Sequence, residues 1–133
     1  MAELLVPISP GELIDKITIL EIKSQRMTDA AKLHNVRTEL ALLTDTWQAS
    51  SYSATDISAE WAGLRDINAR LWDIEDDIRD KERHGCFDAE FVELARAIYF
   101  ANDERAAIKK RINAKLGSAL VEEKSYADYR KRG

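Results

Sequence analysis

The amino-acid sequence predicts an all-α protein, an antiparallel bundle of two helical hairpins with short extended segments at both ends. Composition is the first indication, because 33% of the 133 residues are charged and 45% are hydrophobic, with only five glycines and two prolines. The second is that apolar residues recur at steps of three and four through four segments. The third is that residues with a helix-capping preference stand at the segment boundaries.

The first helix is predicted over residues 10–27. Ser9 precedes it as an N-cap, Pro10 suits the first helical position, and Glu12 is placed to complete a capping box. Its apolar residues do not form one stripe. One face carries Leu13, Ile17, Leu20 and Met27, whereas Ile19 and Ile22 point in nearly the opposite direction. A helix that is apolar on two sides contacts partners on two sides.

The second helix is predicted over residues 30–47, after Asp29 as its N-cap. Its apolar residues again alternate in steps of three and four, which suits antiparallel packing on the first helix through a tight turn. Residues 48–56 show no periodicity and many small polar side chains, so we expect a loop there.

Two longer helices are predicted over residues 57–83 and 88–115, with Asp88 as N-cap and Gly117 as the stop signal. Their inner lines are apolar except at Asn68, Glu75 and Arg105. A hairpin turn near Gly85 brings Asn68 opposite Arg105. A buried arginine needs a partner, which is Asn68, Glu75 or a carboxylate of the first helix such as Glu21. This polar layer is either a device that sets the helix register or a ligand pocket.

The unequal helix lengths predict that the second hairpin extends beyond the first. The projecting end carries apolar residues that nothing in a single chain is placed to cover, which favours a homodimer. The predicted contact residues are Ile78, Phe87, Phe91, Val92 and Leu94. The end segments at 4–8 and 119–124 are expected to be extended and can pair as short strands, with Pro7 limiting the pairing to one edge.

Charge and cysteine content narrow the class of function. A net charge of −4 argues against general nucleic-acid binding, and we expect the basic run Arg130-Lys131-Arg132 to be a solvated end. Cys86 is the only cysteine, which suits a reducing compartment. No apolar stretch reaches the roughly 20 residues that span a bilayer. We therefore expect a single cytoplasmic domain over residues 1–133, without nucleic-acid or membrane partners.

Three stretches of the chain resemble an uncharacterised bacterial family of short helical proteins. The N-terminal stretch has the pattern P-I-S-x-G-E-L-x-D-K-I-x-I-L-E-I-K, and the other two begin at Leu71 and Asn102. The resemblance implies a prokaryotic cytosolic protein with no established activity. The polar residues that it groups together are Asp15, Lys16, Glu21, Lys23, Trp72, Glu75, Asn102, Asp103, Arg105 and Lys109.

Two hypotheses for function follow. The leading one is a non-catalytic helical module for interaction or oligomerisation, of unknown biological role, with a homodimer and an unidentified protein partner as its expected contacts. The alternative is a small helical enzyme or binding protein with a charged inter-helix pocket for an anionic metabolite or nucleotide. One form of this alternative is a protein that depends on Mg²⁺. The candidate binding residues are Arg105, Lys109, Lys16, Glu75, Asn68, Asp103, Trp72 and Asn102. We assign no catalytic residue, metal ligand or cofactor.

Overall fold

A computed structural model describes residues 3–129 of the chain, and the run Arg130-Lys131-Arg132 lies outside them. The described residues form four α-helices and one short 3-10 helix. These are α1 (Pro10–Arg26), α2 (Ala30–Ala49), η1 (Ser51–Ala54), α3 (Ser58–Arg83) and α4 (Ala89–Leu116). The all-α prediction is confirmed, and each predicted helix boundary lies within two residues of the observed one.

The helix ends follow the capping chemistry of the sequence. Ser9 Oγ accepts a hydrogen bond from a first-turn amide of α1 at 3.2 Å, Asp29 does the same for α2 at 2.9 Å, and Asp88 for α4 at 3.0 Å. At the end of α4, Gly117 adopts the left-handed conformation, with φ of 66°. A side chain at that φ is strained, so Gly117 ends the helix where the sequence predicts.

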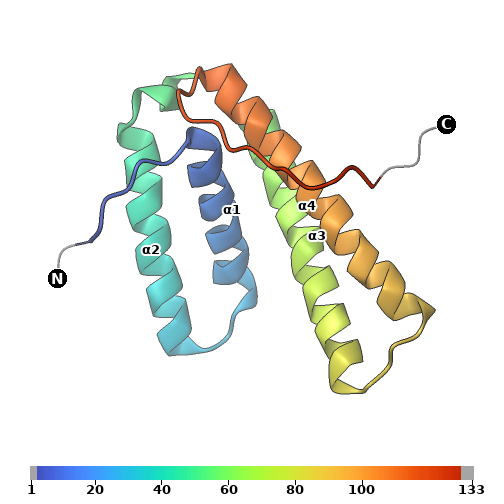
Figure 1. The fold of residues 1–133 in the computed structure, drawn as a ribbon. Coiled ribbons are helices and arrows are strands. Elements are labelled where there is room, and N and C mark those ends of the chain that lie inside the picture. Colours follow the sequence, from blue (N-terminus) through green and yellow to red (C-terminus); the bar gives the residue numbers. More distant parts are fainter. Residues whose placement is uncertain (1–2, 130–133) are drawn as a thin grey trace.

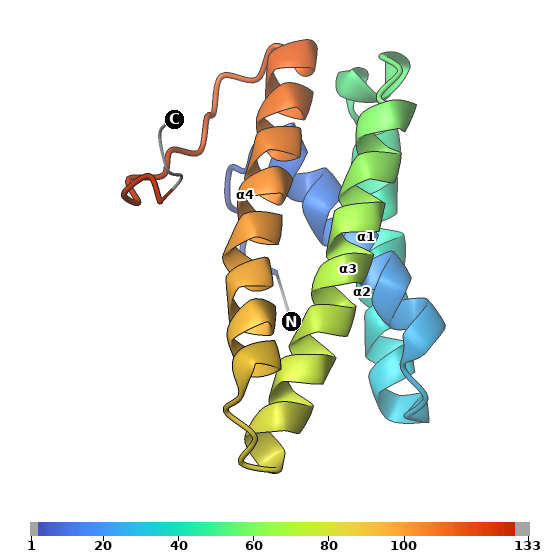
Figure 2. The ribbon, with the colours of Figure 1, turned by 90° about the vertical axis from the view of Figure 1, so that its right-hand side faces the viewer.

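The four helices do not form a symmetric bundle. α1 lies between α2 on one side and the α3–α4 pair on the other, and it crosses that pair obliquely (Figures 1 and 2). α2 packs mainly on α1, and it meets α3 near the connecting loop, where the rings of Trp47 and Trp61 lie 6.0 Å apart. The central position of α1 explains why its sequence is apolar on more than one side.

The hydrophobic core lies at the crossing of α1 with α3 and α4. Its largest fully buried apolar side chains are Ile14, Ile17, Leu64, Ile67 and Ile112. Burial of one such side chain contributes about 1.5–3 kcal/mol of transfer free energy. Buried polar side chains lie at the same crossing, so the packing of these helices fixes the polar side chains as well as the apolar core.

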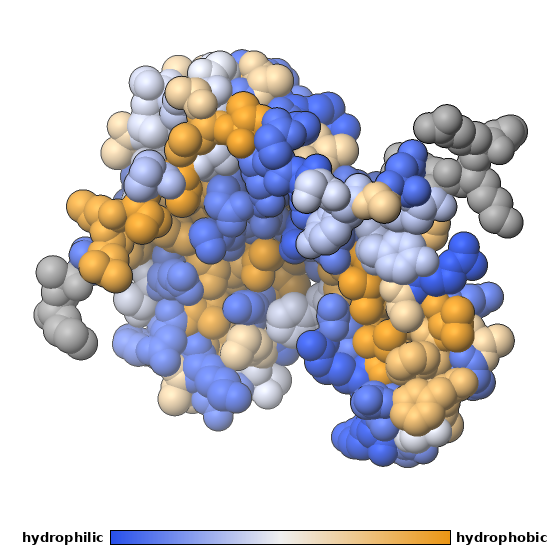
Figure 3. All heavy atoms as spheres, in the orientation of Figure 1, coloured by the Kyte–Doolittle hydropathy of each residue, from blue (hydrophilic) through white to orange (hydrophobic). Residues whose placement is uncertain are grey.

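The α3–α4 hairpin extends beyond the α1–α2 hairpin. α3 has 26 residues and α4 has 28, against 17 and 20 for α1 and α2. At 1.5 Å per residue the difference is about 10–15 Å of helix. The turn between α3 and α4 therefore projects past the turn between α1 and α2 (Figures 1 and 2), and hydrophobic side chains gather on this projecting end (Figure 3).

The segments outside the helices carry no regular structure. Residues 3–129 contain no β-strand, so the expectation that the two end segments pair as strands is wrong for the residues that the structure describes. Instead residues 118–129, which we call the tail, run back along α4 (Figure 1). The tail has no strand partner; side-chain hydrogen bonds attach it to α4. No helix within residues 3–129 has the length and apolar content to cross a membrane.

Candidate functional site

The first turn of α1 lies directly against α4 because of one glycine. The Gly11 amide donates a hydrogen bond to Asn113 Oδ1 at 2.8 Å. A Cβ atom at Gly11 would come within 2.6 Å of the Lys109 carbonyl oxygen, so only glycine allows this approach. As a result, the acidic residues of the first turns of α1 reach the side chain of Lys109.

Lys109 is the centre of a buried ion cluster. Its residue is only 9% exposed, and its Nζ lies 2.6 Å from Glu12, 3.0 Å from Glu122 and 3.9 Å from Asp15. The Glu12 carboxylate therefore binds Lys109, and does not complete the capping box that the sequence predicts. Since Glu122 belongs to the tail, the cluster joins α1, α4 and the tail.

The ion cluster shifts the titration of its members. Burial of the Lys109 ammonium acts to lower its pKa, but hydrogen bonds to Glu12 and Glu122 outweigh burial, so the pKa is raised above its usual value. The hydrogen bond from Lys109 lowers the pKa of Glu122, and the charge of Lys109 adds to this effect. Both groups therefore remain charged at neutral pH.

A buried polar layer continues from the ion cluster into the core. Asn68 Nδ2 donates to Asp15 Oδ1 at 2.9 Å and to Thr18 Oγ1 at 3.1 Å, while Thr18 Oγ1 donates to the Asp15 carbonyl at 2.8 Å. All three residues are buried. Among the described residues, every buried side-chain nitrogen and oxygen has a hydrogen-bond partner. The layer is thus fully satisfied and fixes the orientation of Asn68.

Arg105 lies at the outer edge of this layer and differs from the other members. Its guanidinium is half-buried, and its hydrogen bond within residues 3–129 is a long one of 3.4 Å to Asn68 Oδ1. No carboxylate of that range forms an ion pair with it: Glu75 binds Arg79, and Glu21 binds Arg65 at 3.0 Å. Of the partners that the sequence suggests, Arg105 therefore contacts only Asn68, which carries no charge.

Two hollows meet at Arg105. The first, which we call the groove, lies between α1 and the α3–α4 pair, and Ile19, Trp72 and Asn102 are among the residues that line it. The second, which we call the tail cavity, lies between α4 and the tail, with a volume of about 620 Å³. Arg105 and Asn102 line both, so the two hollows share one polar wall.

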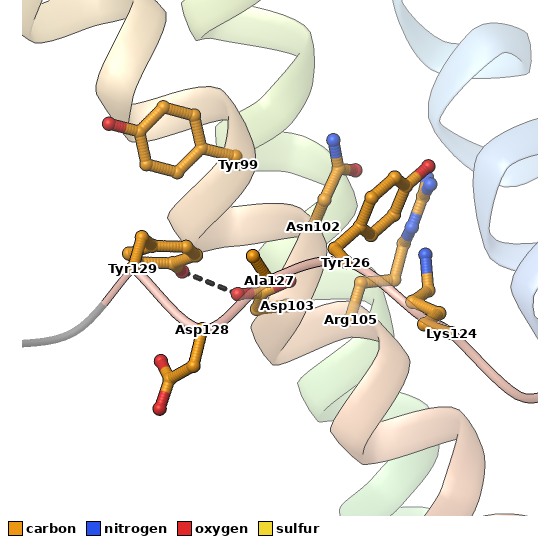
Figure 4. A pocket seen from close by; sticks show the side chains of 9 residues that line it. All are labelled: Tyr99, Asn102, Asp103, Arg105, Lys124, Tyr126, Ala127, Asp128 and Tyr129. Atoms are coloured by element: carbon orange, nitrogen blue, oxygen red, sulfur yellow. Dashed lines mark hydrogen bonds between the residues drawn. The ribbon is translucent and has the colours of Figure 1, made fainter.

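The tail contributes a second cation to this region. Figure 4 shows the side chains of Arg105, Lys124 and Tyr126 on the same side of α4. Lys124 forms no ion pair within residues 3–129, and its Nζ lies 5.6 Å from the centre of the Tyr126 ring. Further along, Tyr129 donates a hydrogen bond to Asp103 and packs against Tyr99 with ring centres 4.9 Å apart. The tail is therefore attached on both sides of Lys124.

The predicted binding residues are partly brought together. Those that line the groove are Arg105, Asn68, Trp72, Glu75 and Asn102. Asp103 lines the tail cavity, Lys109 belongs to the ion cluster, and Lys16 is exposed, 3.9 Å from Glu12. The sequence reasoning missed Lys124 and Tyr126, because an irregular segment has no periodicity that indicates which surface it packs on.

The remaining chemical groups do not form a catalytic arrangement in the part of the chain that the structure describes. Cys86 is exposed, and its Sγ lies 3.9 Å from the His84 carbonyl oxygen, while the His84 ring is 2.8 Å from the Asp80 carbonyl. Within residues 3–129 no group of three or more His, Cys, Asp and Glu side chains is placed to hold a metal ion. Two aspartates of α3 are in ion pairs, Asp73 with Arg26 at 2.6 Å and Asp80 with Arg83.

Comparison with known protein families gives a match over most of the chain. A family described as "Family of unknown function (DUF6165)" matches residues 4–130, almost the whole chain. No curated protein and no solved structure shows a significant match. The expectation of a family without an established activity is thus confirmed.

Proposed function

The chain belongs to this family of unknown function, and from its geometry we propose that it binds a small anionic ligand at Arg105, where the groove meets the tail cavity. The observation that supports this most directly is the half-buried guanidinium without a carboxylate partner in residues 3–129. Two other shielded cations are paired, by contrast: Arg65 has Glu21 at 3.0 Å, and Lys109 has Glu12 at 2.6 Å.

The chemistry of the arginine fits this role. A guanidinium presents its donors in a planar fork that matches the oxygens of a carboxylate or phosphate. Removing such a charge from water without a counter-charge costs free energy, which a bound anion would recover. Asn68 accepts one long hydrogen bond from the guanidinium and is itself fixed by Asp15 and Thr18, so it restricts the position of the guanidinium before the ligand arrives.

The test is a thermal-shift and calorimetric screen of the full chain against phosphate, sulfate, citrate and sugar phosphates. A ligand at 100 times its dissociation constant adds about 2.7 kcal/mol to the free energy of unfolding. We expect at least one anion to raise Tm, and Arg105→Met to lose this response. Arg70→Met is the matched control, because Arg70 lies on the exposed side of α3 in an ion pair with Glu104. If no anion shifts Tm, or if the Arg105 variant responds like wild type, the proposal is wrong.

A second function, self-association through the projecting end of the α3–α4 hairpin, is supported by a separate observation. Phe87 is 64% exposed and Val92 is 53% exposed on this end. Ile78, Phe91 and Leu94 are half-buried beside them, and the rings of Phe87 and Phe91 pack edge to face with centres 5.2 Å apart. We propose that this surface pairs with a second copy of the chain, because covering exposed apolar side chains is favourable.

Light scattering of the purified chain tests the second proposal. We expect a dimer that Phe87→Glu combined with Val92→Glu converts to a monomer. Leu42→Glu is the control, since Leu42 is a similarly exposed apolar residue on α2, away from the projecting end. A wild-type monomer, or a mass that the double variant leaves unchanged, would remove this second function without affecting the first.

We also propose a cytoplasmic location, because the single cysteine, Cys86, is exposed and free, which suits a reducing compartment.

A further inference from the structure

We infer that the ligand is a nucleoside monophosphate, whose phosphate lies between Arg105 and Lys124 and whose base lies in the tail cavity beside Tyr126. This inference rests on the proposed anion site and adds the chemical class of the ligand. Three independent features of the tail cavity support it: its charge, its size and its aromatic wall.

The charge of the cavity matches a phosphate monoester better than a single carboxylate. Arg105 and Lys124 both line it, and neither forms an ion pair within residues 3–129. A phosphate monoester carries a charge of about −1.5 to −2 at pH 7, so two cations balance it. Neither acidic residue of the cavity binds these cations: Asp103 accepts the Tyr129 hydroxyl, and Asp128 points away from Arg105 (Figure 4). Glu122 interacts with both cations only at longer range, because its carboxylate is bound to Lys109 at 3.0 Å.

The size of the cavity indicates more than an inorganic ion. Its volume of about 620 Å³ lies within the range of roughly 300–1,000 Å³ that is usual for sites of small organic ligands. The groove continues from the same wall through Arg105 and Asn102. A ligand held at Arg105 by its phosphate therefore has room for a sugar and a ring.

The aromatic wall indicates what that ring is. Tyr126 is 83% exposed and lies beside Lys124, and Tyr99 lines the same cavity. Exposed tyrosine rings of this kind stack on nucleobases. Asn102 lies between the two tyrosines in the close view (Figure 4), and its amide offers both a donor and an acceptor to the edge of a base.

The experiment is isothermal titration of the full chain with AMP, GMP, CMP, UMP, ribose 5-phosphate and inorganic phosphate. We expect at least one nucleotide to bind about tenfold or more tightly than ribose 5-phosphate. Tyr126→Ala should remove most of this difference while leaving ribose 5-phosphate binding unchanged. Lys124→Ala should weaken both ligands about equally. Tyr126 and Lys124 are exposed, so both variants should fold, and Lys32→Ala on the exposed surface of α2 is the charge control.

The outcomes separate this inference from the proposed function. If ribose 5-phosphate or inorganic phosphate binds as tightly as the best nucleotide, and Arg105→Met abolishes that binding, the nucleotide inference is overturned and the anion site remains. If a nucleotide binds but Tyr126→Ala has no effect on its affinity, the inference is also overturned. If none of the phosphates or other anions binds, both the inference and the proposed function fail.

Discussion

Replacing Gly11 by alanine sets two physical effects against each other. Alanine is a better helix former than glycine, by about 0.5–1 kcal/mol, and this effect alone predicts a more stable protein. The structure opposes it, because the new Cβ would lie 2.6 Å from the backbone oxygen of Lys109 and 2.9 Å from Asn113 Oδ1. A backbone oxygen cannot turn away as a side chain can, so α1 must move.

The steric effect should be the larger one. Overpacking a close contact between helices costs about 1–3 kcal/mol. The movement also lengthens the buried hydrogen bond from the Gly11 amide to Asn113, and weakening such a bond costs about 1 kcal/mol. After subtracting the gain in helix propensity, we expect Gly11→Ala to lower the free energy of unfolding by about 2 kcal/mol.

Urea unfolding followed by circular dichroism measures this difference. With m-values of about 1–3 kcal/mol/M, the midpoint should fall by about 1 M. Gly63→Ala on α3 is the matched control, because its Cβ would meet only the end of the Ile108 side chain at 3.4 Å. We expect Gly63→Ala to be neutral or to stabilise the chain by up to about 1 kcal/mol. A Gly11→Ala variant as stable as wild type would refute the close contact between α1 and α4.

Three further predictions concern the ion cluster and the ligand. Lys109→Met leaves the buried carboxylate of Asp15 without its cation, so urea unfolding should show a free energy of unfolding lower by about 3 kcal/mol. Lys110→Met is the control on the exposed side, and it should change that free energy by less than about 0.5 kcal/mol. Glu122→Gln should lower stability at pH 7 by about 1 kcal/mol after allowance for its exposure. Because the folded pKa of Glu122 lies below the unfolded one, its contribution is complete above the unfolded pKa and is lost as the pH falls through the folded value. The two proteins should therefore converge in stability in acid, with Glu123→Gln as the comparison. Calorimetric affinity for a nucleoside monophosphate should rise between pH 5 and 7, because the second phosphate ionisation lies near pH 6; a flat profile over this range would contradict recognition of the dianion.

Local chemistry made most of the fold predictable. The caps at Ser9, Asp29 and Asp88 and the stop at Gly117 depend on residues that are adjacent in the chain, and each is observed where the sequence predicts it. The periodicity of the long helices also placed Asn68 on the buried side, where it is 5% exposed. The same periodicity was misleading for Glu75, which is only half-buried and bound to Arg79.

The candidate site was only partly predictable, because its partners come from distant parts of the chain. Asn68 and Arg105 could be paired from the hairpin geometry alone. The contact of Glu12 with Lys109 could not, since it depends on how α1 crosses α4. Lys124 lies on an irregular segment, and no local pattern places such a segment against Arg105.

The sequence by itself determined the helices, because hydrogen bonds, caps and apolar periodicity act over a few residues. It also determined that the second hairpin is longer than the first. The tertiary structure decided which charges are paired and which are left open, because pairing depends on the crossing of α1 over α3 and α4 and on the path of the tail. At that crossing Lys109 forms ion pairs with three carboxylates, whereas Arg105 forms none within residues 3–129, a difference that no stretch of sequence encodes alone.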